Sequence, residues 1–187
     1  MYENTMKTKR HLMLPPFKTA LCLLMLLFFT VKTVARNGMR AYDIWPVPQQ
    51  QVLEGGTVPT TAMATLIVGK GCDSYTVNRA KTVLQEHGIT PVVGKKAVSG
   101  RMTVILGVNG SGDAADKAAS RLSLSRDVFG KAKYDRHAIA VSAGKDGNAE
   151  VIVLGENTDA VFCGLASLEQ MLDAKKDKLR KVRIYDY

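Results

Sequence analysis

Short apolar runs recur along the chain after residue 60, and polar or glycine-containing segments separate them. Each run spans only a few positions, which is typical of a buried strand and too short for an ordinary helix. The runs predict five strands, over residues 64–68, 89–93, 102–106, 137–141 and 150–154. A last strand is expected over residues 183–186, which read Arg-Ile-Tyr-Asp.

Apolar residues at helical spacing predict three helices between these strands. The first has Asp73 or Ser74 as its N-terminal cap and stops at Gly88. The second is short and rich in alanine, from about residue 113 to residue 122. The third carries one apolar stripe, which predicts that it covers one face of a sheet; the stripe consists of Val161, Leu165, Leu168 and Leu172.

The segment before these elements has a different pattern. Pro46 and Pro48 fix an extended path over residues 43–50. Beyond them, the Gly55-Gly56 pair lies between two short stretches, 51–54 and 57–59, and this arrangement favours a hairpin.

The order of these elements predicts an α+β fold: a two-layer α/β arrangement of a mixed β-sheet and about three helices, the main ones packed on one face. Strands alternate with helices, as they do around parallel sheets. Several neighbouring strands, however, are joined by turns too short for a crossover helix. Some strand pairs are therefore expected to be antiparallel.

Residues 1–35 have the layout of a signal peptide. Basic residues flank a charge-free run of thirteen residues from Thr19 to Val31, and the small-residue segment 33–35 follows. A membrane-spanning helix needs about 20 apolar residues, and Lys18 and Lys32 end the run earlier. The sequence predicts export to the periplasm or out of the cell, a linker over 36–43 and one domain over 44–187.

The formal net charge of +9 includes the charge of the predicted leader. The first 35 residues hold five cations and one acid, so residues 36–187 carry +5. The densest basic run, residues 175–183, holds six cations but no interleaved aromatic residues. Because nucleic-acid sites combine both features, no nucleic-acid partner is predicted, and the run is interpreted as a solvated connection before the last strand.

Beyond the leader the chain has two cysteines, Cys72 and Cys163. An oxidising compartment permits a disulfide between them. Two cysteines so far apart in sequence do not make a disulfide framework, however. Two separate buried thiols are the favoured interpretation.

Candidate chemistry is sparse. Residues 107–113 form a glycine-rich loop between a strand and a helix, where backbone amides can bind phosphate, but the spacing fits neither a Walker loop nor a Rossmann turn. A plain turn with Ser111 or Asp113 as helix cap is preferred. His87 is expected to serve the last turn of its helix and His137 to be a partly exposed strand residue. No catalytic residue, no cofactor-binding residue and no metal ligand is assigned.

Residues 150–172 read as a strand, a Gly-Glu-Asn-Thr-Asp turn and a helix that contains Phe-Cys-Gly-Leu. With the last strand, 182–187, this segment resembles the N-terminal domain of bacterial O-GlcNAcases and hyaluronoglucosaminidase-like β-N-acetylhexosaminidases of glycoside hydrolase families 84 and 20. Residues 44–49, Ile-Trp-Pro-Val-Pro-Gln, are similar to the opening of that domain. Cys163 departs from the tyrosine that the family usually has.

The resemblance implies a small α/β domain that supports a catalytic barrel. The family's mechanism uses two adjacent acids in that barrel, and this sequence has neither an Asp-Asp pair nor a barrel. We therefore expect a non-catalytic accessory domain whose partner in cis, the barrel, is missing through truncation or because the domain stands alone. Gly164, which costs about 1 kcal/mol relative to alanine in mid-helix, indicates the close approach of another backbone.

Two other functions stay open from the sequence. A nucleotide-binding α/β protein would use the loop 107–112. An independent glycan-binding module would need exposed aromatic side chains, and Trp45 is the first candidate; the full set is Tyr42, Trp45, Tyr75, Phe129, Tyr134, Phe162, Tyr185 and Tyr187.

Overall fold

The computed structural model describes residues 40–187 except for 132 and 175–176. The expected signal peptide, 1–35, and residues 36–39 of the expected linker lie outside the described residues. Within the described chain the strands are β1 (Gln50–Pro59), β2 (Met63–Val68), β3 (Thr90–Gly94), β4 (Met102–Val108), β5 (His137–Ala143), β6 (Ala149–Gly155) and β7 (Lys178–Asp186). The helices are α2 (Ser74–Glu86), α3 (Ala114–Arg121) and α4 (Thr158–Ala174), with a short 3₁₀ helix, η1 (Asp127–Gly130).

The seven described strands form one mixed sheet in the order β1-β7-β5-β6-β4-β2-β3. The strands β6, β4, β2 and β3 run parallel to one another. The strands β1, β7 and β5 form an antiparallel half, which joins the parallel half where β5 pairs with β6. The predicted α+β fold with a mixed sheet and three helices is therefore confirmed.

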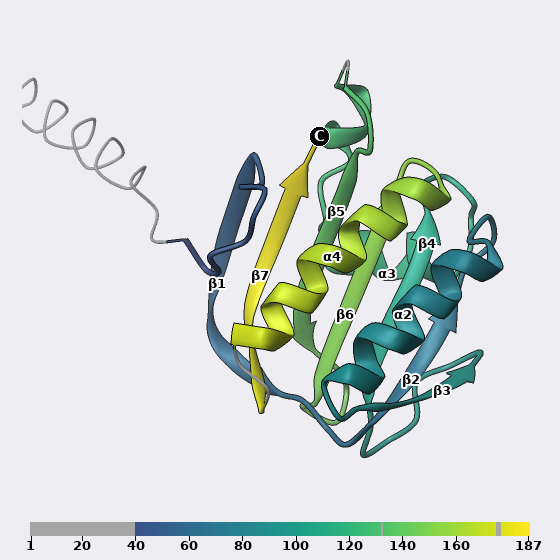
Figure 1. Ribbon diagram of the computed structural model, residues 1–187, viewed down its shortest axis with the longest axis vertical. Helices are drawn as coiled ribbons and strands as arrows, with labels where there is room; N and C mark the ends of the chain where they lie inside the picture. The colour runs from purple at the N-terminus through teal and green to yellow at the C-terminus, as the bar shows by residue number, and fades with distance from the viewer. Residues whose placement is uncertain (1–39, 132, 175–176) are drawn as a thin grey trace, which may run out of the picture. The chain divides into compact units, whose positions relative to one another are not determined.

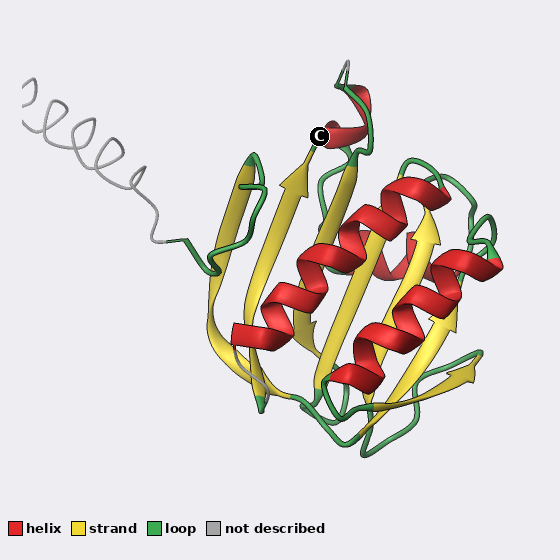
Figure 2. Cartoon of the chain, in the orientation of Figure 1, coloured by secondary structure: helices red, strands yellow, loops and turns green. Residues whose placement is uncertain are grey.

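Helices lie on both faces of the sheet. The longer helices, α2 and α4, lie side by side across one face, and α3 lies behind the sheet in the same view (Figure 1, Figure 2). The face under α2 and α4 carries the larger apolar core. All four residues of the predicted stripe on α4, Val161, Leu165, Leu168 and Leu172, are buried in it.

The residues near β1 give a first correction. The expected hairpin over 51–59 is wrong, because both stretches belong to one strand, β1, which pairs with β7 along its length. The register shifts between Leu53 and Thr57, and Gly55 and Gly56 both have positive φ there. The glycine pair therefore makes a bulge in a continuous strand, because pairing with β7 on both sides outweighs a local turn.

The basic run 175–183 gives a second correction. The described β7 begins at Lys178, so a large part of the run belongs to a paired strand and not to a connection. Leu179 and Val182 lie among the cations and are buried in the core, so this part of the run packs as a strand.

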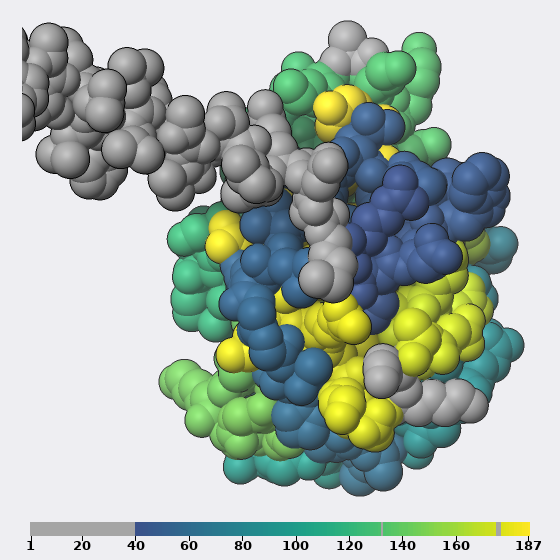
Figure 3. Space-filling model, turned by 90° about the vertical axis from the view of Figure 1, so that its left-hand side faces the viewer, coloured from purple at the N-terminus to yellow at the C-terminus, as the bar shows by residue number. Residues whose placement is uncertain are grey.

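The segment before β1 packs on the C-terminal elements. Ala41 and Tyr42 are buried, and the hydroxyl of Tyr42 accepts a hydrogen bond from the Arg180 N–H at 2.7 Å. The packed domain thus extends to residue 41, three positions before the expected start at 44. Figure 3 shows this N-terminal segment lying against the yellow surface of α4 and β7. Among the described helices, none combines the length and the apolar character needed to cross a membrane.

Candidate functional site

Three loops meet at the carboxyl ends of β2, β4 and β6, where α/β proteins commonly bind ligands. Each loop leads into a helix: β2 into α2, β4 into α3 and β6 into α4. The glycine-rich loop 107–113 is one of them. Whether this end of the sheet can bind an anion depends on what its amides and helix N-termini already contact.

Asp113 joins two of these loops. Its Oδ1 accepts from the N–H of Ala115 at 2.9 Å and caps α3, and its Oδ2 accepts from the N–H of Lys70 at 2.6 Å. A Cβ on Gly69 would lie 2.5 Å from that Oδ2, so a glycine is needed for the loops to approach. The prediction of a turn is confirmed, with Asp113 and not Ser111 as the cap.

Asp116 accepts from two amides of the glycine-rich loop. Its carboxylate accepts from the N–H groups of Gly110 at 3.1 Å and Gly112 at 2.6 Å, and from Arg126 at 2.6 Å. Burial raises the pKa of Asp116, but these hydrogen bonds outweigh it and hold the pKa below its usual value. Because the loop donates to an internal carboxylate, an incoming phosphate would have to displace that carboxylate.

The third loop is closed in the same manner. Asn157 Oδ1 accepts from the N–H of Ala160 at 2.9 Å and caps the first turn of α4. Thr158 Oγ1 accepts from the N–H of Asp73 at 3.1 Å, and Asp73 caps α2 by accepting from the N–H of Thr76 at 2.7 Å. The carboxyl end of the sheet is therefore a network of internal hydrogen bonds.

The histidines have different surroundings. His87 lies with Nδ1 2.7 Å from the carbonyl oxygen of Val83 and Nε2 2.9 Å from Asp173 Oδ1, so its predicted role at the end of α2 is confirmed. The expectation of a partly exposed His137 is wrong, because its side chain is buried beneath α4. The strand β5 lies between β6 and β7, and α4 covers this interior strand.

Gly164 explains how α4 approaches the sheet. A Cβ at this position would lie 2.6 Å from Cγ1 of Val153 and 3.2 Å from Cδ2 of His137. The prediction of close approach is confirmed, but the expected partner is corrected. The neighbours are side chains of β6 and β5, and not another backbone.

Cys72 and Cys163 are free, half-buried thiols. Burial, followed by the charges of Asp113 and Asp73, raises the pKa of Cys72 to about 11. Burial also raises the pKa of Cys163. Since thiolates are the nucleophilic form, neither cysteine has the surroundings of a catalytic nucleophile. No group of three or more metal-binding side chains occurs in the part of the chain that the structure describes.

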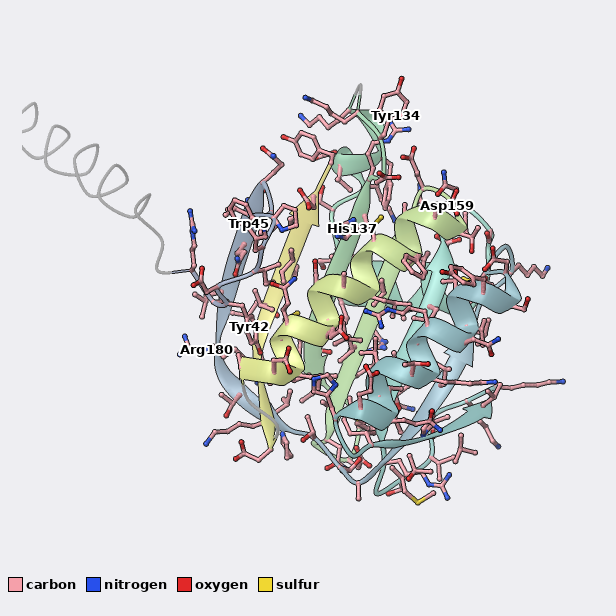
Figure 4. All side chains as sticks on the ribbon, viewed as in Figure 1. Tyr42, Trp45, Tyr134, His137, Asp159 and Arg180 are labelled. Carbon is pink, nitrogen blue, oxygen red and sulfur yellow. The ribbon has the colours of Figure 1, made fainter. Side chains whose placement is uncertain are left out.

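The exposed aromatic residues are dispersed. Trp45, Tyr75 and Tyr134 are 78%, 71% and 89% exposed, whereas Tyr42 and Tyr185 are buried. Figure 4 shows Tyr134 at one end of the molecule, away from Trp45 beside β1. Tyr75 stacks on Phe162 with ring centroids 5.2 Å apart. These side chains do not make one continuous aromatic platform.

The fold and these contacts define an α+β domain. Its candidate polar side chains, such as Asp113, Asp116 and His87, make hydrogen bonds within the domain. The family model of glycosyl hydrolase family 20, domain 2, matches residues 41–187, so the chain belongs to this family. That domain is an accessory domain of glycoside hydrolases. The resemblance to the N-terminal hexosaminidase-type domain is therefore confirmed.

Solved structures agree with the family. CpGH84D is similar over 78% of this chain and 24% of its own length, with 27% identity and a TM-score of 0.70. The GH20 exo-β-N-acetylglucosaminidase from Vibrio harveyi, as its D437A inactive mutant, shares the fold over 79% of this chain and 19% of its own, with 14% identity and a TM-score of 0.53. The chain thus spans about a quarter or less of these proteins. A comparison with curated protein sequences found no match.

Proposed function

We propose that the chain is the non-catalytic accessory domain of a β-N-acetylhexosaminidase-type glycoside hydrolase and supports its catalytic barrel in cis. The observation that carries this proposal is the family match, which covers residues 41–187 and so nearly the whole described domain. The two structural relatives support it, because each is roughly four to five times as long as the region that this chain matches.

The contacts at the carboxyl end favour a supporting role over catalysis. A glycosidase needs two carboxyl groups that flank free space for the glycosidic bond. Here Asp113 and Asp116 are engaged by backbone amides of their own chain, and Asp116 also by Arg126. The purified chain is expected to release no 4-nitrophenol from 4-nitrophenyl N-acetyl-β-glucosaminide. Steady release that survives repurification would contradict the proposal.

A domain exchange tests the supporting role. The matching region of CpGH84D is deleted in one variant and replaced by residues 41–187 of this chain in another. We expect the deletion to be insoluble or unstable and the exchange to restore a soluble barrel with a higher Tm, because the sheet and helices of the two domains superimpose at a TM-score of 0.70. An exchange variant no more stable than the deletion variant would contradict the proposed support.

Export is a further part of the proposal, motivated by the leader-like pattern of residues 1–35. Expression of the full chain in a Gram-negative bacterium, followed by fractionation and N-terminal sequencing, tests it. Export predicts a periplasmic product that has lost its first residues at a position near 35. An intact cytoplasmic product would contradict it.

The exposure of Trp45 favours a second candidate function, that of a glycan-binding module. Its side chain is exposed, while its backbone is fixed by Gln170, which accepts from the N–H at 2.8 Å and donates to the carbonyl at 2.9 Å. A fixed, exposed indole is a suitable surface for stacking on a sugar ring. Glycan-array binding that disappears in Trp45→Ala but persists in Tyr134→Ala would support this candidate.

A further inference from the structure

The face of the sheet that carries α3 contains a cavity of about 840 Å³. The cavity lies between the loop 95–101, one side of α3 and the turn that joins β5 to β6. Its volume falls within the range of about 300–1,000 Å³ that is usual for small-molecule sites. It exists because α3 is short: the eight residues of this helix pack on β4 and β6 and leave the amino-terminal end of that face uncovered.

The floor of the cavity is largely apolar. Ile67 and Ile105 contribute from β2 and β4, and Ala114 and Ala118 contribute from α3. The small side chains of α3 leave room above the strands. No aromatic side chain lines the described cavity, so stacking on a neutral sugar ring or a nucleobase is not what it offers.

One hydrogen bond joins two walls of the cavity. Asp146, in the turn between β5 and β6, accepts from the N–H of Gly100 at 2.7 Å and from the N–H of Asn148 at 3.2 Å. Gly100 belongs to the opposite wall, the loop 95–101. This bond restrains the two walls relative to each other before any ligand arrives, which reduces the entropy lost on binding.

The rim is strongly basic. Six cationic side chains line the cavity: Lys95, Lys96, Arg101, Lys117, Arg121 and Lys145. Two carboxylates accompany them, so the residues that line the cavity carry a net charge of +4. Residues 36–187 as a whole carry +5. The cavity is thus a local excess of positive charge, separate from the basic run 175–183.

Both carboxylates of the cavity already have partners. Glu150 is buried and pairs with Arg121, and Asp146 takes the amides described above. The amide of Gly100 and then the groups of Asn148 hold the pKa of Asp146 below its usual value, which is the wrong direction for a general acid. The cavity is therefore suited to binding and not to glycoside hydrolysis.

Among the described residues, the other five cations have no ion-pair partner. Like charges around a low-dielectric hollow focus a positive potential, which attracts anions and relieves the mutual repulsion when they bind. Arg101 offers a planar fork for a carboxylate or sulfate, and the lysines offer point charges.

We propose that this cavity binds an anionic sugar unit, a mono- or disaccharide that carries carboxylate or sulfate groups. The cationic rim recognises the anionic groups, and the apolar floor contacts the C–H faces of the ring. The charge requirement follows from the cavity itself, whereas the choice of a sugar as carrier rests on the proposed function in a glycoside hydrolase.

Calorimetric titration of the full chain tests the proposal with three probes: a heparin disaccharide, sodium sulfate and neutral chitobiose. We expect saturable one-to-one binding of the heparin disaccharide. The affinity should weaken steeply between about 20 and about 150 mM salt, because added salt shortens the Debye length to about 8 Å and screens the attraction. Sulfate is expected to compete at much higher concentration, and chitobiose is expected not to bind.

The variant Arg101→Ala/Lys117→Ala is expected to weaken binding of the heparin disaccharide about tenfold or more, because two rim charges are lost. Lys178→Ala/Lys181→Ala removes the same charge from β7 and serves as the matched control. Circular dichroism and thermal unfolding of all variants verify the fold. Equal losses in both variants would show non-specific attraction and overturn the proposal.

Three other results would also overturn it. These are the absence of saturable binding at 20 mM salt, binding of chitobiose as tight as that of the heparin disaccharide, and binding of sulfate as tight as that of the disaccharide. The absence of binding is also the outcome expected if an acidic segment of another protein domain fills the cavity. None of these results bears on the domain exchange with CpGH84D, so failure of this inference and failure of the proposed function are distinguishable.

Discussion

At the carboxyl ends of β2, β4 and β6, three loops lead into α2, α3 and α4, and side-chain oxygens of the same chain, several of them carboxylates, accept from their amides. At the amino ends of β4 and β6, the loop 95–101 and the turn between β5 and β6 surround an open cavity. The first end is acidic and closed by hydrogen bonds. The second is basic and open.

The difference shows why strand direction alone does not locate a binding site. Ligands of α/β proteins commonly bind at carboxyl ends because helix N-termini and loop amides are free there. In this chain Asp73, Asp113 and Asp116 use those donors internally. The free donors are the cations at the opposite end, so a ligand is expected where the chain has left charge without a partner.

The tight closure of the carboxyl end can be broken by one methyl group. A Cβ on Gly107 would lie 2.1 Å from Cβ of Ala115, which forces α3 away from β4. We expect Gly107→Ala to lower the free energy of unfolding by about 3 kcal/mol, the upper range for overpacking a core. Urea unfolding measures this loss.

Gly130→Ala is the matched control, because a Cβ at Gly130 has no neighbour within 4 Å and the residue has no positive φ. Its effect is expected to stay within about 0.5 kcal/mol. Equal stabilities of the two variants would mean that the loops at the carboxyl end are not closely packed.

The burial at the carboxyl end, together with its carboxylates, can be tested at Cys72. Burial, then Asp113 and Asp73, raise its pKa to about 11 from an ordinary 9.0. Two pKa units reduce the thiolate fraction near pH 8 about 100-fold, so alkylation by iodoacetamide is expected to be slower by a similar factor than for a free thiol. Peptide-resolved mass spectrometry at several pH values separates Cys72 from the other cysteines. A rate that levels off below pH 9 would contradict the raised pKa.

Asp116 tests whether the glycine-rich loop depends on its internal carboxylate. Asp116→Ala leaves the amides of Gly110 and Gly112 without their acceptor and removes one of several acceptors of the Arg126 guanidinium, and we expect a loss of about 2 kcal/mol in the free energy of unfolding. Asp127→Ala, at an exposed position in η1, is the control. A loss no larger than the control's would mean that water replaces the carboxylate at little cost.

The same carboxylate predicts a dependence on pH. Burial raises the pKa of Asp116, but hydrogen bonds from Arg126, Gly110 and Gly112 outweigh it, and the folded-state pKa lies below the ordinary 3.8. The stabilisation is therefore fully present above pH 3.8 and is lost as the pH falls through the lower, folded-state value. As the pH is lowered through this window, the free energy of unfolding of the wild type should fall more than that of Asp116→Ala, so that the two stabilities converge, as urea unfolding at each pH would show.

The sequence predicted the elements of both ends better than their chemistry. The caps at Asp73 and Asp113, the stop at Gly88 and the stripe on α4 were readable because they depend on neighbours a few residues away. The hairpin at Gly55 and Gly56 failed because β7, more than a hundred residues later in the chain, pairs with both halves of β1. His137 was misjudged because its burial depends on α4.

The basic cavity had no signal in the sequence. Its six cations come from three separate segments, 95–101, 117–121 and 145, and none of these is dense enough to stand out. The dense run 175–183 is the clearest basic signal in the sequence, yet part of it is a paired strand. Charge clustering of this kind arises from the packing of α3 beside two loops, which the order of residues does not reveal.

The smallest expected effect concerns the hydrogen bond that joins the walls of the cavity. Asp146→Ala removes the acceptor of the Gly100 N–H, and we expect the Gly100 amide to exchange with deuterium about fivefold faster while the core amides of β4 are unchanged. Asp43→Ala, at an exposed position before β1, is the control. Because looser walls make the cavity less preorganised, affinity for the heparin disaccharide should fall about threefold even though the variant loses a negative charge. Tighter binding in Asp146→Ala would show that net charge, and not the fixed spacing of the walls, governs this end of the sheet.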